Sequence, residues 1–171
     1  MIVSILVIAG AFALWSVVHS FLASRWLKRR AHRALGESLY RWYRVTYVGF
    51  AVASLLFVLA LVPLFPDRTL YSVPSPWRYL MMGVVQLTAV AGLVVSLLQA
   101  GVMHFLGVSS LLGEEAPPSS RLQVRGLYRL VRHPNYLFGI IFIWTMPLMT
   151  ANLATLFACM TLYLVIGSYH E

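Results

Sequence analysis

Long apolar runs alternate along the chain with short segments that are rich in charge or proline. Three of these runs, Ile2 to Ala23, Val45 to Phe65 and Tyr79 to Gln99, have the roughly 20 residues that a membrane-spanning helix needs. Two more, Tyr136 to Thr150 and Leu153 to Tyr169, follow near the C-terminus with only a short connection between them. The pattern predicts about five transmembrane helices, the last two forming a tight hairpin.

The first run of this hairpin is short for a bilayer. As a helix, Tyr136 to Thr150 would cover roughly 22 Å, whereas the hydrocarbon core is about 30 Å thick. Either the helix begins earlier, near Pro134, or neighbouring parts of the protein shelter the hairpin. Pro134 suits a first helical turn, because the N–H that proline lacks has no partner there.

The composition indicates an integral membrane protein. Of the 171 residues, 60% are hydrophobic and only 11% are charged, which is more apolar surface than one soluble core can bury. The alternating pattern of a membrane β-barrel is absent. We therefore expect an all-α helical bundle that forms a single domain over residues 1–171. Cys159 is the only cysteine, so no intrachain disulfide is possible.

The chain carries a formal net charge of +8, and its basic residues lie beside the apolar runs. Anionic lipid headgroups attract such residues, so we expect membrane lipids and no nucleic acid as partners. Seven Lys or Arg residues lie between the first two runs, two between the second and third, and four between the third and fourth. The positive-inside rule then places the N-terminus outside and the C-terminus in the cytoplasm, in what we expect to be a bacterial-type plasma membrane.

A cluster of ionisable and aromatic side chains precedes the fourth run. In the stretch "GLYRLVRHPNYLFG", Gly126 to Gly139, Arg132 and His133 lie at a predicted helix start, whose free N–H groups favour an anion. The stretch predicts a cytosol-facing site for a carboxylate or phosphate. The alternative is that Arg125, Arg129 and Arg132 only determine the topology and extend toward lipid phosphates.

The same stretch resembles the pattern G-x-Y-x-x-x-R-H-P-x-Y-x-x-G of the isoprenylcysteine carboxyl methyltransferase-like superfamily of membrane methyltransferases. Within that superfamily, the likeness is closer to NnrU-like proteins and methanethiol S-methyltransferases. It rests on "HSFLASRWLK" from His19, "MHFLGVSSL" from Met103 and "WTMPLMT" from Trp144. The resemblance therefore covers most of the chain.

This resemblance implies S-adenosylmethionine as the methyl donor, bound on the cytosolic side. The residues implied on its adenosine side are Gln123, Val124, Gly126 and Tyr128. Those implied around its amino-acid end are Arg132, His133, Pro134 and Tyr136. Glu171 matches the first of two glutamates in the family pattern and would meet the cofactor's ammonium group. The second glutamate is missing from the sequence, so we expect the C-terminus to be truncated.

The function implied is methyl transfer to a small thiol or to a lipid-like, isoprenoid acceptor that enters from the bilayer. A thiol reacts as its thiolate, and its pKa of roughly 8.5 falls near a cationic group, so no dedicated base is required. His133 either orients the cofactor or acts as a catalytic base. No metal ion is expected, because His19, His104 and His133 are scattered and lack nearby thiols or carboxylates.

Two other functions remain open from the sequence. A non-catalytic family relative would serve as an accessory subunit of a membrane protein complex and keep the motif as a scaffold. A channel or transporter is less consistent with apolar runs that contain few polar groups and no paired acidic residues. His19, an ionisable residue within the first run, is either a functional residue or a partner in a hydrogen bond between helices.

Overall fold

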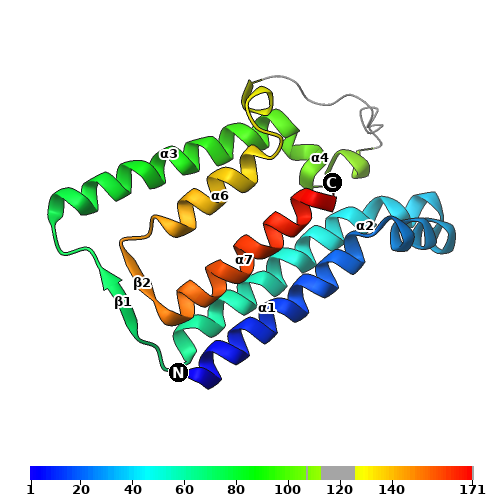
Figure 1. Cartoon of the computed structure of the whole chain (residues 1–171). Helices are drawn as coiled ribbons and strands as arrows, with labels where there is room; N and C mark the ends of the chain where they lie inside the picture. The colour runs from blue at the N-terminus through cyan, green and yellow to red at the C-terminus, as the bar shows by residue number, and fades with distance from the viewer. Residues whose placement is uncertain (107, 113–125, 171) are drawn as a thin grey trace.

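Four long helices dominate the computed structural model, which describes residues 1–106, 108–112 and 126–170 (Figure 1). They are α1 (Ile2–Ala23), α2 (Arg25–Leu61), α3 (Pro76–Ala100) and α7 (Ala151–His170). Each is long and apolar enough to cross a membrane. Two short helices, α4 (Val102–Leu106) and α5 (Val108–Leu111), follow α3. The protein is an all-α membrane bundle, as the sequence predicts.

The fourth predicted helix is present but short. α6 (Pro134–Trp144) begins at Pro134, as expected, yet it ends at Trp144 and does not continue to Thr150. Its 11 residues cover roughly 16 Å, about half of the hydrocarbon core. Pro147 explains the early end, because a proline disfavours the helical conformation in the residue before it. The chain continues as strand β2 (Leu148–Thr150).

Two short strands join the connections at one end of the bundle. The 3₁₀ helix η1 (Val62–Leu64) ends the second span and is followed by strand β1 (Thr69–Ser72). β1 pairs antiparallel with β2, placing Thr69 opposite Thr150 and Ser72 opposite Leu148. Figure 1 shows this ribbon linking the α2–α3 connection to the α6–α7 connection. The apolar pattern does not predict it, because segments of three and four residues are too short to show alternation.

α2 contains a sharp turn at Gly36, where φ is 68° and ψ is 170°. This positive φ suits glycine, which has no Cβ to clash with the backbone. The turn divides α2 into a basic first arm, residues 25–35, and a longer second arm, residues 37–61. Ser24 caps the first arm, because its hydroxyl oxygen accepts the Leu27 N–H at 3.2 Å. The basic segment between the first two apolar runs is therefore helical.

The helices pack as two groups. α1 packs against α2 and α7, while α3 packs against α6. α3 and α6 approach closely at Gly92, where an added Cβ would lie 2.5 Å from the Phe138 ring. Trp144 connects the two groups, because its Nε1–H donates to the Thr161 hydroxyl of α7 at 2.9 Å. The main buried core lies near the ribbon and consists of Ile8, Phe12, Val58, Val62, Ile143, Met149, Leu156 and Phe157.

α7 begins at a buried polar junction beside this core. The Asn152 side chain is fully buried. Its Nδ2 donates, at 3.4 to 3.5 Å, to the main-chain oxygens of Val62, Phe65 and Pro66. The Asp67 carboxylate accepts the Asn152 N–H at 3.0 Å. A carboxylate at a helix start is stabilising, because it meets the free N–H groups and the positive end of the helix dipole.

Acidification is expected to weaken this junction through Asp67. Burial acts to raise the pKa of its carboxyl, but hydrogen bonds from Thr150, Asn152, Arg68 and Ala151 outweigh burial and lower the pKa from its ordinary value of 3.8. The stabilisation is therefore complete at neutral pH and is lost as the pH falls through the lowered pKa. In detergent, Asp67→Asn should melt at a lower temperature than the unmodified protein at pH 7, and the difference should shrink below about pH 4. A difference that is constant with pH would contradict this role.

Candidate functional site

The motif lies where α3 ends and α6 begins. Its first residues form a short 3₁₀ helix, η2 (Gly126–Arg129), which rests on the last turns of α3. The Leu127 N–H donates to Gln99 Oε1 at 3.0 Å. The Tyr128 hydroxyl donates to the main-chain oxygen of Ser96 at 3.4 Å. Burial raises the pKa of the Tyr128 phenol, so this group remains a neutral donor at neutral pH. These contacts anchor the motif to α3.

A side chain at position 126 is expected to strain the backbone at this contact. Its φ of 60° lies in the left-handed region, and an added Cβ would overlap the side-chain amide of Gln99. Gly126→Ala should therefore lower the free energy of unfolding in detergent by about 1 to 2 kcal/mol. Gly139→Ala is the matched control within the motif, because a Cβ there would meet nothing within 4 Å. Equal effects of the two substitutions would contradict the left-handed conformation of Gly126.

α6 starts at His133 and Pro134. The N–H groups of Tyr136 and Leu137 both donate to the main-chain oxygen of His133 at 3.1 Å. Pro134 occupies the first turn of the helix and is fully buried. The half-buried His133 ring stacks on the Tyr136 ring, with centroids 5.0 Å apart and planes 17° apart. His133 thus begins the helix with its backbone and pairs with Tyr136 through its ring.

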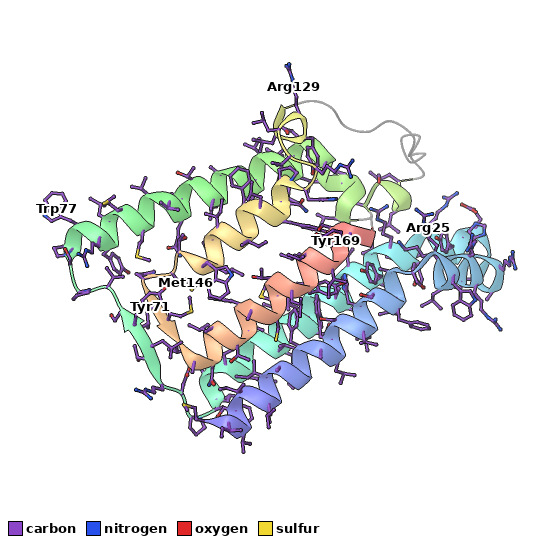
Figure 2. The ribbon with its side chains drawn as sticks, viewed as in Figure 1. Arg25, Tyr71, Trp77, Arg129, Met146 and Tyr169 are labelled. Atoms are coloured by element: carbon purple, nitrogen blue, oxygen red, sulfur yellow. The ribbon has the colours of Figure 1, made fainter. Side chains whose placement is uncertain are left out.

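The two described arginines of the motif occupy different positions. Both Arg129 and Arg132 are exposed. Arg129 ends η2, and Figure 2 shows it pointing away from the bundle. Arg132 directly precedes His133 and so lies next to the start of α6. Of these two residues, only Arg132 is next in the chain to the helix start, where an anion is favoured.

Six of the nine site residues predicted from the sequence lie in this one segment: Gly126, Tyr128, Arg132, His133, Pro134 and Tyr136. Gln123, Val124 and Glu171 lie outside the described residues, so their roles stay predictions. α6 and α7 run in opposite directions, so the start of α6 and the end of α7 lie at the same end of the bundle (Figure 1).

A second polar cluster connects α1, α2 and α7 toward that end. His19 stacks on Trp15 with ring centroids 4.8 Å apart, and its Nε2 lies 3.0 Å from the Tyr47 hydroxyl. Tyr163 meets the His19 ring edge-on, and its hydroxyl lies 3.1 Å from Ser20 Oγ. The sequence identifies His19 but not Tyr47 or Tyr163, because three helices bring these residues together. Only the spacing of four between Trp15 and His19 signals a shared helix face. The geometry favours a hydrogen bond between helices as the role of His19.

A hollow of about 660 Å³ lies at the opposite end of the bundle. It is lined by residues before and within the first turn of α3, among them Pro74, Trp77 and Leu80. None of the six described site residues lines it, and most of its lining side chains are apolar. It therefore adds nothing to the candidate site at the start of α6.

Comparison with known proteins assigns the chain to a class. The model of the phospholipid methyltransferase family matches residues 80–169, which is just over half of the chain. The match runs from α3 through the motif to α7. The chain belongs to this family, and the resemblance to membrane methyltransferases is confirmed.

Two individual proteins are also similar to this chain. The chain is 31% identical to the methanethiol S-methyltransferase of a Pseudomonas species, over 98% of this chain and 64% of that protein. It is 42% identical to methanethiol S-methyltransferase 1 of Bradyrhizobium diazoefficiens over 57 residues, which are 33% of this chain and 20% of that protein. The chain thus spans less than two thirds of the length of either relative. No solved structure matches it significantly.

Proposed function

We propose that this protein is a membrane methyltransferase that transfers a methyl group from S-adenosylmethionine to a small thiol or a lipid-like acceptor. The observation that carries the proposal is the identity to a methanethiol S-methyltransferase, which extends over 98% of this chain. The family match across α3, α6 and α7 supports the same class of reaction. The motif at one end of the bundle is the expected place for the methyl donor.

The residues at the start of α6 fit the charged end of this cofactor. Its carboxylate is an anion, and Arg132 offers an exposed guanidinium group beside a helix start. The stacked rings of His133 and Tyr136 would offer a flat aromatic surface in the same segment. Gly126 and Tyr128 of η2 would then lie on the adenosine side. Each assignment predicts a loss of cofactor affinity on substitution.

We place this end of the bundle in the cytoplasm. It carries the basic first arm of α2, residues 25–35, and the motif arginines Arg129 and Arg132. Of the Lys and Arg residues that the structure describes, the opposite end, with the ribbon, carries only Arg68 and Arg78. Cytoplasmic segments of membrane proteins are enriched in Lys and Arg, which supports this orientation. A cytoplasmic methyl donor then reaches the motif directly.

In this reaction the side chains mainly have to align the reacting groups. The bound cofactor supplies a reactive methyl group on a positively charged sulfur. A direct displacement requires the attacking sulfur, the methyl group and the leaving sulfur to lie in line in a dry pocket. Arg132 and the start of α6 would hold the carboxylate of the cofactor, and His133 would orient it beside Tyr136. The positive charge on the cofactor's sulfur would lower the pKa of the thiol acceptor from roughly 8.5. The thiol would then lose its proton to water or to His133.

The surface of α6 supports an acceptor that arrives from the bilayer. Leu137 and Trp144 are each 42% exposed on this short helix. In a membrane-spanning bundle, exposed apolar side chains of this kind face lipid. An apolar thiol dissolved in the bilayer therefore reaches α6 without crossing a layer of water.

Methyl transfer from labelled S-adenosylmethionine to a panel of thiols and isoprenoid acceptors, with the complete protein in detergent, tests the proposal. Arg132→Ala should weaken cofactor binding roughly tenfold, as expected for the loss of one hydrogen bond to a charged group. Arg129→Ala is the matched control and should change affinity by about twofold or less. Equal small losses of cofactor affinity in the two variants would indicate that both arginines only determine the topology. Absence of any cofactor binding would support the accessory-subunit alternative.

A further inference from the structure

The first arm of α2, residues 25–35, carries a basic stripe that the proposed methyl transfer does not use. The stripe consists of Trp26, Arg29, Arg30 and Arg33. Their spacing of i, i+3, i+4 and i+7 places these four side chains on one face of the helix. All four are exposed, and together they line a hollow of about 280 Å³.

The charge of this stripe is not neutralised within the part of the chain that the structure describes. No carboxylate of a described residue lies within 4.0 Å of its three guanidinium groups. Glu37 pairs instead with His32, at 2.8 Å, and Asp67 lies at the opposite end of the bundle. Like charges three and four residues apart destabilise a helix. An anion that bridges the arginines relieves this repulsion.

Trp26 gives the stripe an aromatic wall and a position relative to the membrane. The Arg30 guanidinium lies 5.5 Å from the centroid of the Trp26 ring, at the distance of a cation–π contact. On its other side, Trp26 meets the exposed Phe21 of α1, with ring centroids 6.1 Å apart. Phe21 belongs to the last turn of a membrane-spanning helix, and tryptophan is enriched at the membrane interface. The stripe therefore lies at the depth of the lipid headgroups.

We propose that this stripe binds the phosphate headgroup of an anionic phospholipid. The planar guanidinium group pairs with two phosphate oxygens at once, which suits three arginines on one face. Trp26 and Phe21 contact the glycerol and the upper acyl chain. Only Ser24 separates the first arm from the end of α1, so the arm lies at the membrane surface, where lipid phosphates are concentrated. A lipid is therefore favoured over free phosphate. The bound lipid holds the first arm against the membrane and maintains the turn at Gly36.

Native mass spectrometry of the protein in detergent with added phosphatidylglycerol tests this site. Arg30→Gln/Arg33→Gln removes two charges from the stripe, and Arg41→Gln/Arg129→Gln removes the same charge from exposed positions outside it. The first variant should bind phosphatidylglycerol roughly tenfold more weakly, and the second should stay within about twofold of the unmodified protein. The two variants and the unmodified protein should bind phosphatidylcholine equally. Equal losses of phosphatidylglycerol in both variants would overturn the proposal.

A second measurement uses the unmodified protein, so it does not depend on how a variant folds. Phenylglyoxal modifies accessible guanidinium groups, and peptide mass spectrometry follows each arginine separately. Phosphatidylglycerol vesicles, compared with phosphatidylcholine vesicles, should slow the modification of Arg29, Arg30 and Arg33 more than that of Arg41 and Arg129. Equal protection of all five arginines would overturn the proposed site. Equal protection by inorganic phosphate without lipid would overturn the assignment to a lipid.

Discussion

His133→Ala is expected to weaken binding of the cofactor by about 1 to 3 kcal/mol, the usual effect of leaving a buried polar group without its partner. The substitution keeps the main-chain oxygen of residue 133, so the N–H groups of Tyr136 and Leu137 retain their acceptor. α6 should therefore still begin at Pro134. The imidazole ring and its stack on Tyr136 are lost. Calorimetry with S-adenosylhomocysteine on the unmodified and variant proteins measures the change.

Companion variants separate the possible roles of His133. His133→Gln and His133→Asn should recover part of the affinity, because both supply a hydrogen-bonding side chain. If His133 acts as a base, binding survives and the chemical step slows by a factor of roughly 100 to 10,000. That loss shrinks at high pH, where a thiol acceptor ionises unaided. Unchanged affinity together with an unchanged rate would exclude both roles.

Gly92→Ala is expected to lower the free energy of unfolding by about 1 to 3 kcal/mol, the usual effect of adding a carbon to a packed contact. Gly92 is buried in α3, and an added Cβ would lie 2.5 Å from the Phe138 ring of α6. Phe138 is about one turn from Pro134, so its displacement moves the start of α6. Cofactor affinity should therefore fall together with stability. Unfolding in detergent and calorimetry with S-adenosylhomocysteine measure the two effects.

Gly83→Ala is the matched control for this substitution. Gly83 lies on the same helix, and an added Cβ would meet nothing within 4 Å. The change should be neutral or slightly stabilising, because alanine is the better helix former. Adding Phe138→Ala to Gly92→Ala should restore part of the fit between α3 and α6. Equal losses of stability in Gly92→Ala and Gly83→Ala would contradict the close approach of α3 and α6 at Gly92.

The long helices are predictable because the bilayer leaves few alternatives. A lipid-exposed segment has no water to satisfy its main-chain groups, so an apolar run of sufficient length forms a helix. The first run, Ile2 to Ala23, coincides with α1. The third, Tyr79 to Gln99, lies within α3 (Pro76–Ala100). The final run, from Leu153, begins two residues after α7 does at Ala151.

The breaks in the helices are harder to predict from the sequence. Gly36 is the only glycine of the polar segment Ser24 to Arg44, but no apolar pattern there indicates that the chain turns at it. α6 ends at Trp144 although the apolar run continues to Thr150. The last three residues of that run, Leu148–Thr150, pair with Thr69–Ser72 of β1, a segment far away in the sequence. Hydropathy reports how apolar a segment is and not which distant strand it meets.

The sequence by itself determined the helical membrane class and the relative placement of Arg132, His133 and Pro134, because these residues are adjacent and begin one helix. Only the tertiary structure decided that η2 rests on Gln99 of α3 and that His19 meets Tyr47 of α2. A local pattern specifies which conformation a segment adopts and which of its residues share a face. Contacts between segments far apart in the chain depend on how the helices pack, which no short stretch of sequence reports.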